Sequence, residues 1–130
     1  MNEADTEVIR EVWRRWNEGR RDLDPKVTDP DLEIHSALAG TAFRGADGLA
    51  KWMAEIDDQF EGWEIAISEL REVGPGAYLV HGEIKALGRQ SGLRLDQPAS
   101  WLVGVREGRI WRLHNFIGPD ARQRAEAEAA

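Results

Sequence analysis

The sequence is 130 residues long and carries a formal net charge of −7, so it suits one domain, and its acidity argues against a nucleic-acid partner. It contains no cysteine, which excludes disulfides, thiolate metal sites and a cysteine nucleophile. The start MNEADTE lacks a signal pattern and no apolar run is long enough to cross a membrane. We therefore expect one domain over residues 1–130, located in the cytoplasm, with no membrane contact.

The first predicted element is an amphipathic helix over residues 4–18. Its apolar residues recur at intervals of three and four: Ile9, Val12, Trp13 and Trp16. The opposite side is charged, so both tryptophans are expected in the core, where either one can also line a cavity. Residues 22–29 predict one or two further helical turns, because Pro25 stands near their start.

A strand and a second long helix follow. Residues 31–38 alternate as a strand does, and residues 39–45, AGTAFRG, are predicted to form a loop. A helix is expected over residues 46–61, with Gly62 as its stop. One stripe of this helix is apolar: Leu49, Trp52, Met53, Ile56 and Phe60.

From Trp63 onward the apolar period changes from that of a helix to that of a strand. Three strands are predicted from this pattern. The first runs from Trp63 to a Gly-Pro-Gly turn, the second covers residues 78–87, and the third covers residues 93–106 with a bend at Pro98. The tail, residues 120–130, predicts a short fraying helix. This order predicts an α+β fold with helices on one face of an antiparallel sheet.

The most informative stretch is ASWLVGVREGRIWRLHNFI, residues 99–117, in which Glu107-Gly108 predicts a hairpin turn. Strand alternation places one set of side chains on the same face: Ala99, Trp101, Val103, Val105, Trp111, Leu113, Asn115 and Ile117. Two indoles and one amide would form a wall suited to a flat apolar molecule that a single polar group orients.

Three segments resemble the SnoaL-like branch of the nuclear transport factor 2-like superfamily, which also contains ketosteroid isomerase. They are DPDLEIHS, FRGADGLAKWM, and GRQSG followed by WLVGVREGRIWRLHNF, and the resemblance spans about residues 8–118. It implies a cone-shaped α+β half-barrel: a curved antiparallel sheet wraps a long helix, and N-terminal helices close an apolar pocket. It also implies pairing into dimers through the outer face of the sheet.

The catalytic positions of ketosteroid isomerase, an Asp base, a Tyr and a protonated Asp, carry no acid or base in this sequence. By spacing, the base falls on Ser36 and the second acid on Trp101, while the tyrosine falls near Val12 or Trp13. The resemblance to SnoaL-like cyclases implies an acidic residue on the last strand, where the inward residues are Leu113, Asn115 and Ile117. The isomerase mechanism is therefore disfavoured, and Asn115 remains able to polarise a carbonyl group.

Histidine is the usual acid–base candidate, and alternation predicts all three histidines on the outer face of the sheet. His81 and His114 alternate along their strands with residues that are expected to point inward. A kink at Ala37 or a bulge near Pro98 would reverse this placement, so His35 stays a catalytic candidate. The three histidines do not have the spacing of a metal motif, and no metal or cofactor is predicted.

Among the carboxylates, Asp96 stands close to Pro98 at the predicted mouth of the sheet. Apolar surroundings there would raise its pKa and suit a general base. The alternative is that Asp96 only forms a turn, which is the commoner role of such a residue.

Two function classes remain open. The first is a cofactor-independent enzyme of the isomerase, cyclase or hydrolase type, with His35, Asp96 and Asn115 as catalytic candidates. The second is a non-catalytic ligand-binding or dimeric accessory domain. Either class would bind a small apolar molecule, and the expected contacts are Trp13, Trp16, Ser36, Trp52, Trp101, Leu113, Asn115 and Ile117. The expected homodimer interface is the weakly charged outer face with Leu102, Ile110, His114 and Phe116.

Overall fold

The computed structural model describes residues 3–19, 26–36 and 41–129 of the chain. Its elements in chain order are α1 (Glu3–Asn17), β1 (Thr28–Ser36), β2 (Thr41–Arg44), α2 (Gly45–Gln59), β3 (Phe60–Gly74), β4 (Ala77–Gly88), β5 (Arg94–Arg106), β6 (Arg109–Ile117) and α3 (Ala121–Ala129). Both long helices lie within one or two residues of the predicted bounds, because their apolar stripes and the glycines that follow them define them well.

The six strands form one sheet in the order β2-β1-β6-β5-β4-β3. All neighbouring pairs are antiparallel except β1 and β6, which run parallel, so the sheet is mixed and not purely antiparallel as expected. The reason is the path of the chain. Helix α2 carries it from β2 at one edge to β3 at the other, and the meander β3–β6 then returns to lie beside β1.

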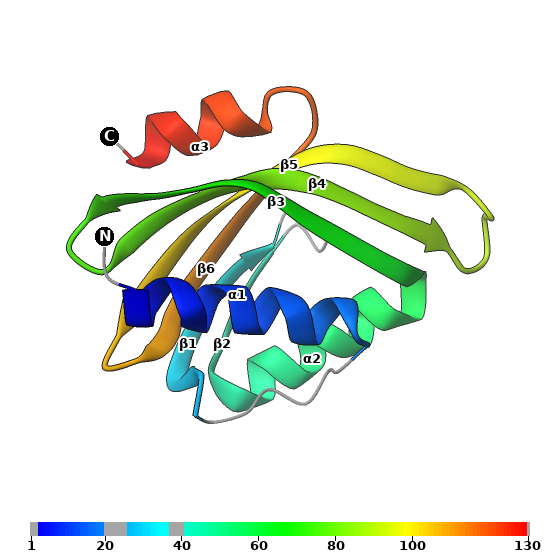
Figure 1. Cartoon of the computed structure of the whole chain (residues 1–130). Coiled ribbons are helices and arrows are strands. Elements are labelled where there is room, and N and C mark those ends of the chain that lie inside the picture. Colours follow the sequence, from blue (N-terminus) through cyan, green and yellow to red (C-terminus); the bar gives the residue numbers. More distant parts are fainter. Residues whose placement is uncertain (1–2, 20–25, 37–40, 130) are drawn as a thin grey trace.

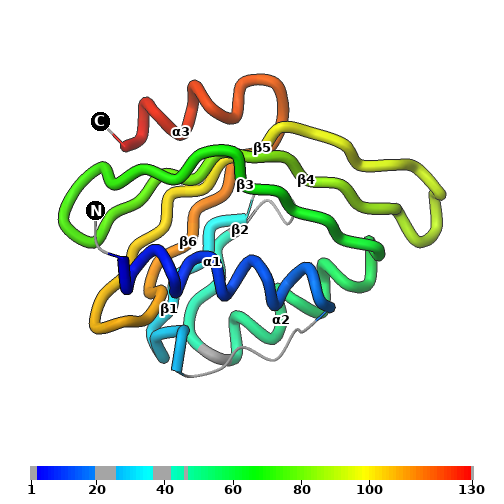
Figure 2. The backbone as a smooth tube through the Cα atoms, in the orientation of Figure 1, coloured from blue at the N-terminus to red at the C-terminus, as the bar shows by residue number. Residues whose placement is uncertain are grey.

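The sheet is strongly curved, and α1 and α2 lie against its concave face (Figure 1). The main core lies between them, where Ile9 and Trp13 of α1 and Ile56 of α2 pack against Tyr78 and Trp101 of the sheet. Helix α3 lies on the opposite side, here called the outer face (Figure 2). This arrangement of a curved sheet and helices confirms the expected cone-shaped α+β half-barrel. No helix in the described part of the chain combines the length and apolar character that a membrane crossing requires.

Two predictions near the N-terminus, a loop and a short helical segment, need correction because strands occupy part of each. The predicted loop over residues 39–45 contains strand β2, which pairs with β1 at the edge of the sheet. Strand β1 begins at Thr28, so the end of the segment predicted as helical turns is extended. Residues 20–25 and 37–40, on which the rest of these predictions fall, lie outside the described residues. Four residues at a sheet edge are too few for a clear alternating pattern, which explains the missed strand.

The predicted position of Trp111 was wrong. The register of β5 and β6 shifts between Gly104 and Val105, so Ile110 joins the inner core and Trp111 turns to the outer face. There its indole occupies the space over Gly104, where an added Cβ would lie 2.6 Å from the Trp111 Nε1. The guanidinium of Arg106 stacks on the same ring at 4.8 Å from its centre. One extra residue in β6 therefore reverses the alternation at its start.

The C-terminal helix α3 packs on the outer face of the sheet, and its predicted fraying stays a prediction. Ala121 and Ala125 of α3 are 1% and 0% exposed, and they pack on Leu79, Leu102 and Phe116 of the outer face. Much of the apolar patch that was expected to form a homodimer interface is thus covered by the chain's own helix. The homodimer itself stays a prediction.

Candidate functional site

A cavity lies between the concave face of the sheet and helices α1 and α2. Its volume is about 60 Å³, and its lining residues are Val12, Trp13, Trp16, Trp52, Ile56, Trp63, Ile65, Ile84, Trp101, Leu113 and Asn115. Trp13, Trp16, Trp52, Trp101, Leu113 and Asn115 lie where strand alternation and helix periodicity predicted them. Their role in ligand binding stays a prediction.

Helix α1 brings two of the tryptophans to the cavity, and hydrogen bonds at both of its ends hold it there. Near its start, the buried Tyr78 hydroxyl donates to Asp5 at 2.8 Å. At its end, the Asn17 amide donates to the Ile65 carbonyl and accepts from the Ile65 N–H, each at 2.8 Å. Sequence analysis missed Asn17, since a polar residue at a helix end carries no sign of a partner 48 positions away.

The tryptophan rings pack mostly against one another. The Trp13 ring meets Trp101 edge-on with centroids 5.2 Å apart, and Trp16 contacts Trp52 at 5.3 Å and Trp63 at 5.6 Å. Such tilted and edge-to-face contacts are favourable and hold the cavity wall in one arrangement. A flat ring in the cavity would continue the same packing.

Asn115 is the one polar residue among the described tryptophans and aliphatic residues that line the cavity. The buried Nε1–H groups of Trp13, Trp52 and Trp63 have no hydrogen-bond acceptor among the described residues. Asn115 adds an amide, which can donate and accept. No acidic, basic or histidine side chain of the described residues lines this cavity. The described part of the cavity wall is therefore mostly apolar, with a single amide among the indoles.

A second cavity of about 50 Å³ lies directly beside the first. The two share Val12, Trp16, Trp52 and Leu113 in their walls. The packed Trp16 and Trp52 rings therefore border both spaces.

Two predicted contacts lie elsewhere. Ser36 is buried at the end of β1 and Ile117 is half-buried against the core, but neither lines the cavity. Sequence analysis in turn missed Trp63, Ile65 and Ile84. Their alternation in β3 and β4 marks them as inward-facing residues, but it does not show which of them border a space and which are packed.

Of the catalytic candidates, the structure brings only Asn115 to the cavity. His35 lies on the outer face, where its ring centre is 5.0 Å from that of His114. Asp96 is exposed on β5, opposite Lys85 of β4. The two residues stay candidates that the geometry does not support.

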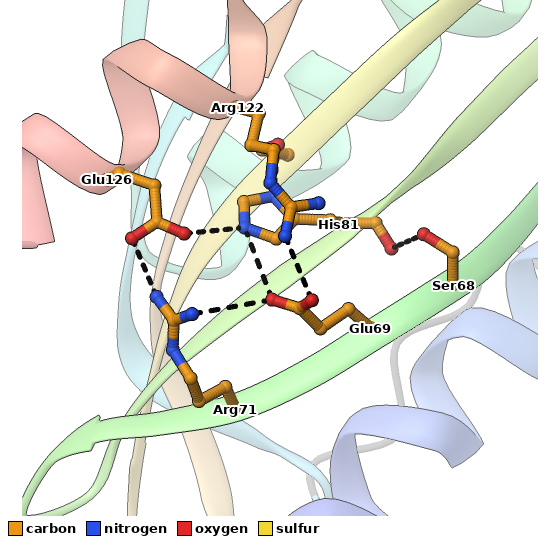
Figure 3. Close-up of polar contacts among 7 residues, drawn as sticks. Ser68, Glu69, Arg71, His81, Arg122 and Glu126 are labelled. Atoms are coloured by element: carbon orange, nitrogen blue, oxygen red, sulfur yellow. Dashed lines mark hydrogen bonds and ion pairs between the residues drawn. The ribbon is translucent and has the colours of Figure 1, made fainter.

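The outer face carries a polar cluster that sequence analysis did not predict (Figure 3). His81, expected on a solvated or subunit-facing side, is only 3% exposed because α3 covers it. Its Nδ1 lies 2.6 Å from the Ser100 Oγ, and its Nε2 lies 3.1 Å from Glu126 and 3.8 Å from Glu69. Ser100 is 1% exposed, so the Ser–His–Glu contact cannot present a nucleophile to a substrate.

Ion pairs and burial set the protonation of the outer-face groups. The pKa of Glu69 is lowered chiefly by a hydrogen bond from Arg122, and the pKa of Glu126 by hydrogen bonds from His81 and Arg71. Burial lowers the pKa of His114, although Glu128, 2.9 Å from its Nδ1, acts in the opposite direction. The titratable groups with shifted pKa thus lie away from the cavity.

Comparison with known proteins yields structural relatives only. No family model matches the sequence, and no curated protein matches it. Among solved structures, a SnoaL-like polyketide cyclase from Jannaschia sp. CCS1 has 18% identity and a TM-score of 0.75 over 94% of this chain and 90% of that one.

Two further structures are similar. An NTF2-like protein of unknown function from Burkholderia pseudomallei has 13% identity and a TM-score of 0.80 over 95% of this chain and 98% of that one. TerC, co-crystallised with polyporic acid, has 16% identity and a TM-score of 0.77 over 94% and 97%. The resemblance to SnoaL-like and NTF2-like proteins is confirmed at the level of the fold.

Proposed function

We propose that this protein binds a small, flat, mostly apolar molecule in the tryptophan-lined cavity, with Asn115 as the polar contact. The observation that carries the proposal is the lining itself. Five indoles surround one amide, and three of the indoles have an Nε1–H without an acceptor. A ligand with a carbonyl or hydroxyl oxygen would accept a hydrogen bond from the Asn115 amide.

The size of the cavity limits the ligand. Known ligand pockets hold about 300–1,000 Å³, whereas this cavity has about 60 Å³ and its neighbour about 50 Å³. An engineered apolar cavity that binds benzene has a volume of about 150 Å³. A flat aromatic ligand would therefore enter only if side chains such as Trp16 and Trp52 move aside.

A second candidate is cofactor-independent catalysis of the isomerase, cyclase or hydrolase type. It is supported by the fold shared with the SnoaL-like polyketide cyclase. In this chain the chemistry would use Asn115 to stabilise developing negative charge on a carbonyl oxygen. Among the described residues, the first cavity has no acidic or basic side chain in its lining, and Arg15, which lines the second, cannot accept a proton. Binding is therefore favoured over catalysis, because proton transfer needs a titratable group within reach of the substrate.

Binding is tested by titrating the intrinsic tryptophan fluorescence with acetophenone, a flat ketone. Saturable quenching is expected for the wild type and for the control variant His35→Ala, whose altered side chain lies on the outer face. An absence of saturable change, with acetophenone and with smaller aromatic compounds, would overturn the proposal.

A measurement on the complex with acetophenone distinguishes binding alone from catalysis. Deuterium exchange at the methyl group of bound acetophenone reports proton abstraction next to a carbonyl. We expect no acceleration over buffer. Acceleration that is lost in Asn115→Leu would favour the enzyme instead.

A further inference from the structure

Helix α3 is joined to the sheet by a compact polar cluster, and this cluster plays no part in the proposed function. Glu69 and Arg71 come from β3, His81 from β4, and Arg122 and Glu126 from α3 (Figure 3). Positions up to 57 residues apart in sequence therefore meet at one point on the outer face.

The cluster offers three ligand atoms that face one another. One oxygen of Glu69, one oxygen of Glu126 and the His81 imidazole nitrogen all lie within 4.8 Å of each other. The separations from the His81 Nε2 are 3.1 Å to Glu126 and 3.8 Å to Glu69. Neighbouring ligands of a Zn²⁺ ion with bonds near 2.1 Å are about 3.0–3.4 Å apart. The His81–Glu126 pair is already in this range, and Glu69 would have to move by up to about 1.5 Å to join it.

The remaining atoms of these side chains are held by groups around the cluster. Arg122 binds the second oxygen of Glu69 at 2.9 Å, and Arg71 binds the second oxygen of Glu126 at 2.6 Å. Each carboxylate thus keeps one oxygen directed at His81. The third Arg contact, from Arg71 to the inward oxygen of Glu69, is long at 3.5 Å.

Ser100 fixes the imidazole from its other side. Its hydroxyl lies 2.6 Å from the His81 Nδ1, and a hydroxyl can either donate to that nitrogen or accept from it. When it accepts, the Nε2 lone pair faces the two carboxylates, which is the tautomer that binds a metal ion. His81 passes from one tautomer to the other without a net change of charge.

We propose that Glu69, His81 and Glu126 form a binding site for a borderline divalent cation such as Zn²⁺ or Co²⁺, which joins α3 to the sheet. One imidazole nitrogen with two carboxylate oxygens suits these ions, whereas Ca²⁺ and Mg²⁺ prefer oxygen ligands alone. The glutamate side chains are 37% and 38% exposed, so an ion reaches the site from solvent. The two guanidinium charges weaken the affinity but leave the ligand atoms in place.

The test is calorimetric titration of the protein with ZnCl₂ alone at neutral pH. The wild type is expected to bind one ion per chain, and Glu126→Gln and Glu69→Gln at least about tenfold more weakly. The matched control is Glu128→Gln, since Glu128 is also on α3 and also contacts one histidine and one arginine, His114 and Arg112. Its affinity should equal that of the wild type.

Two results would overturn the proposal. One is the lack of saturable binding to the wild type up to about 1 mM ZnCl₂. The other is equal weakening in Glu126→Gln and Glu128→Gln, which would place the ion elsewhere. Addition of Co²⁺ locates the ion independently. The paramagnetic ion should shift the imidazole NMR signal of His81 strongly and the signal of His35 much less.

Discussion

Trp101 and Asn115 are direct partners across β5 and β6, and both side chains line the tryptophan-lined cavity. The next pair along these strands, Leu102 and His114, points to the outer face. One residue along the strand therefore takes the side chain from the apolar cavity to the face that carries the histidines. The cavity and the histidines thus lie on opposite sides of the sheet.

The first prediction concerns the cavity amide. Asn115→Leu should weaken binding of acetophenone by about 5- to 10-fold, because one hydrogen bond contributes about 1–1.5 kcal/mol. α-Methylstyrene, in which a CH₂ group replaces the carbonyl oxygen, should bind both proteins equally. Fluorescence titrations with the two compounds make this comparison, and equal weakening for both would show that Asn115 only shapes the cavity.

The second prediction concerns the ring pair between the cavities. Trp52→Ala should join the two spaces and lower the free energy of unfolding by about 2–4 kcal/mol, somewhat less than for a fully buried tryptophan. The variant should gain affinity for bicyclic compounds relative to monocyclic ones. Trp111→Ala is the control, since Trp111 lies on the outer face. A gain of the same size there would contradict the placement of the cavities.

The third prediction concerns Gly82 of β4. A Cβ at this position would lie 1.8 Å from the carbonyl oxygen of Ala66, where β3 shifts register against β4. Because this backbone carbonyl cannot rotate aside as a side chain can, Gly82→Ala should lower the free energy of unfolding by at least about 2–3 kcal/mol, measured by urea unfolding. Gly74→Ala, whose Cβ would meet only the Ala77 Cβ at 3.7 Å, should change stability by less than about 1 kcal/mol.

The fourth prediction concerns pH. The pKa values of Glu69 and Glu126 are lowered in the folded protein, chiefly by Arg122 and by His81 respectively. Their stabilising effect is therefore complete above the ordinary glutamate pKa and is lost as the pH falls through the lowered values. Amide exchange of α3 should accelerate on acidification, and Glu126→Gln should reduce this dependence. A pH profile identical to the wild type would contradict the role of the ion pairs.

The sequence predicted the inner face of the sheet better than the outer one. Alternation in β4, β5 and β6 was sufficient to separate Trp101 and Asn115 from His81 and His114. It failed at Trp111, because a one-residue bulge reverses alternation without a characteristic residue to mark it. Sequence periodicity also shows which side chains point inward, but not that Trp63 borders a space while Tyr78 is tightly packed.

The outer-face cluster was beyond prediction for a different reason. His81 shares its side of the strand with Glu83 and Lys85 and therefore resembles a solvated histidine. Its burial depends on α3, whose alanine-rich sequence gives no sign of the surface it covers. Contacts such as Glu126 to His81 join segments 45 residues apart, and only the assembled fold brings them together.

The most direct test of the central claim is a ¹H–¹⁵N NMR titration of the six indole Nε1–H signals with acetophenone. Binding in the tryptophan-lined cavity should shift the signals of Trp13, Trp52, Trp63 and Trp101 and leave that of Trp111 unchanged. Saturable shifts confined to Trp111, or none at all, would contradict it.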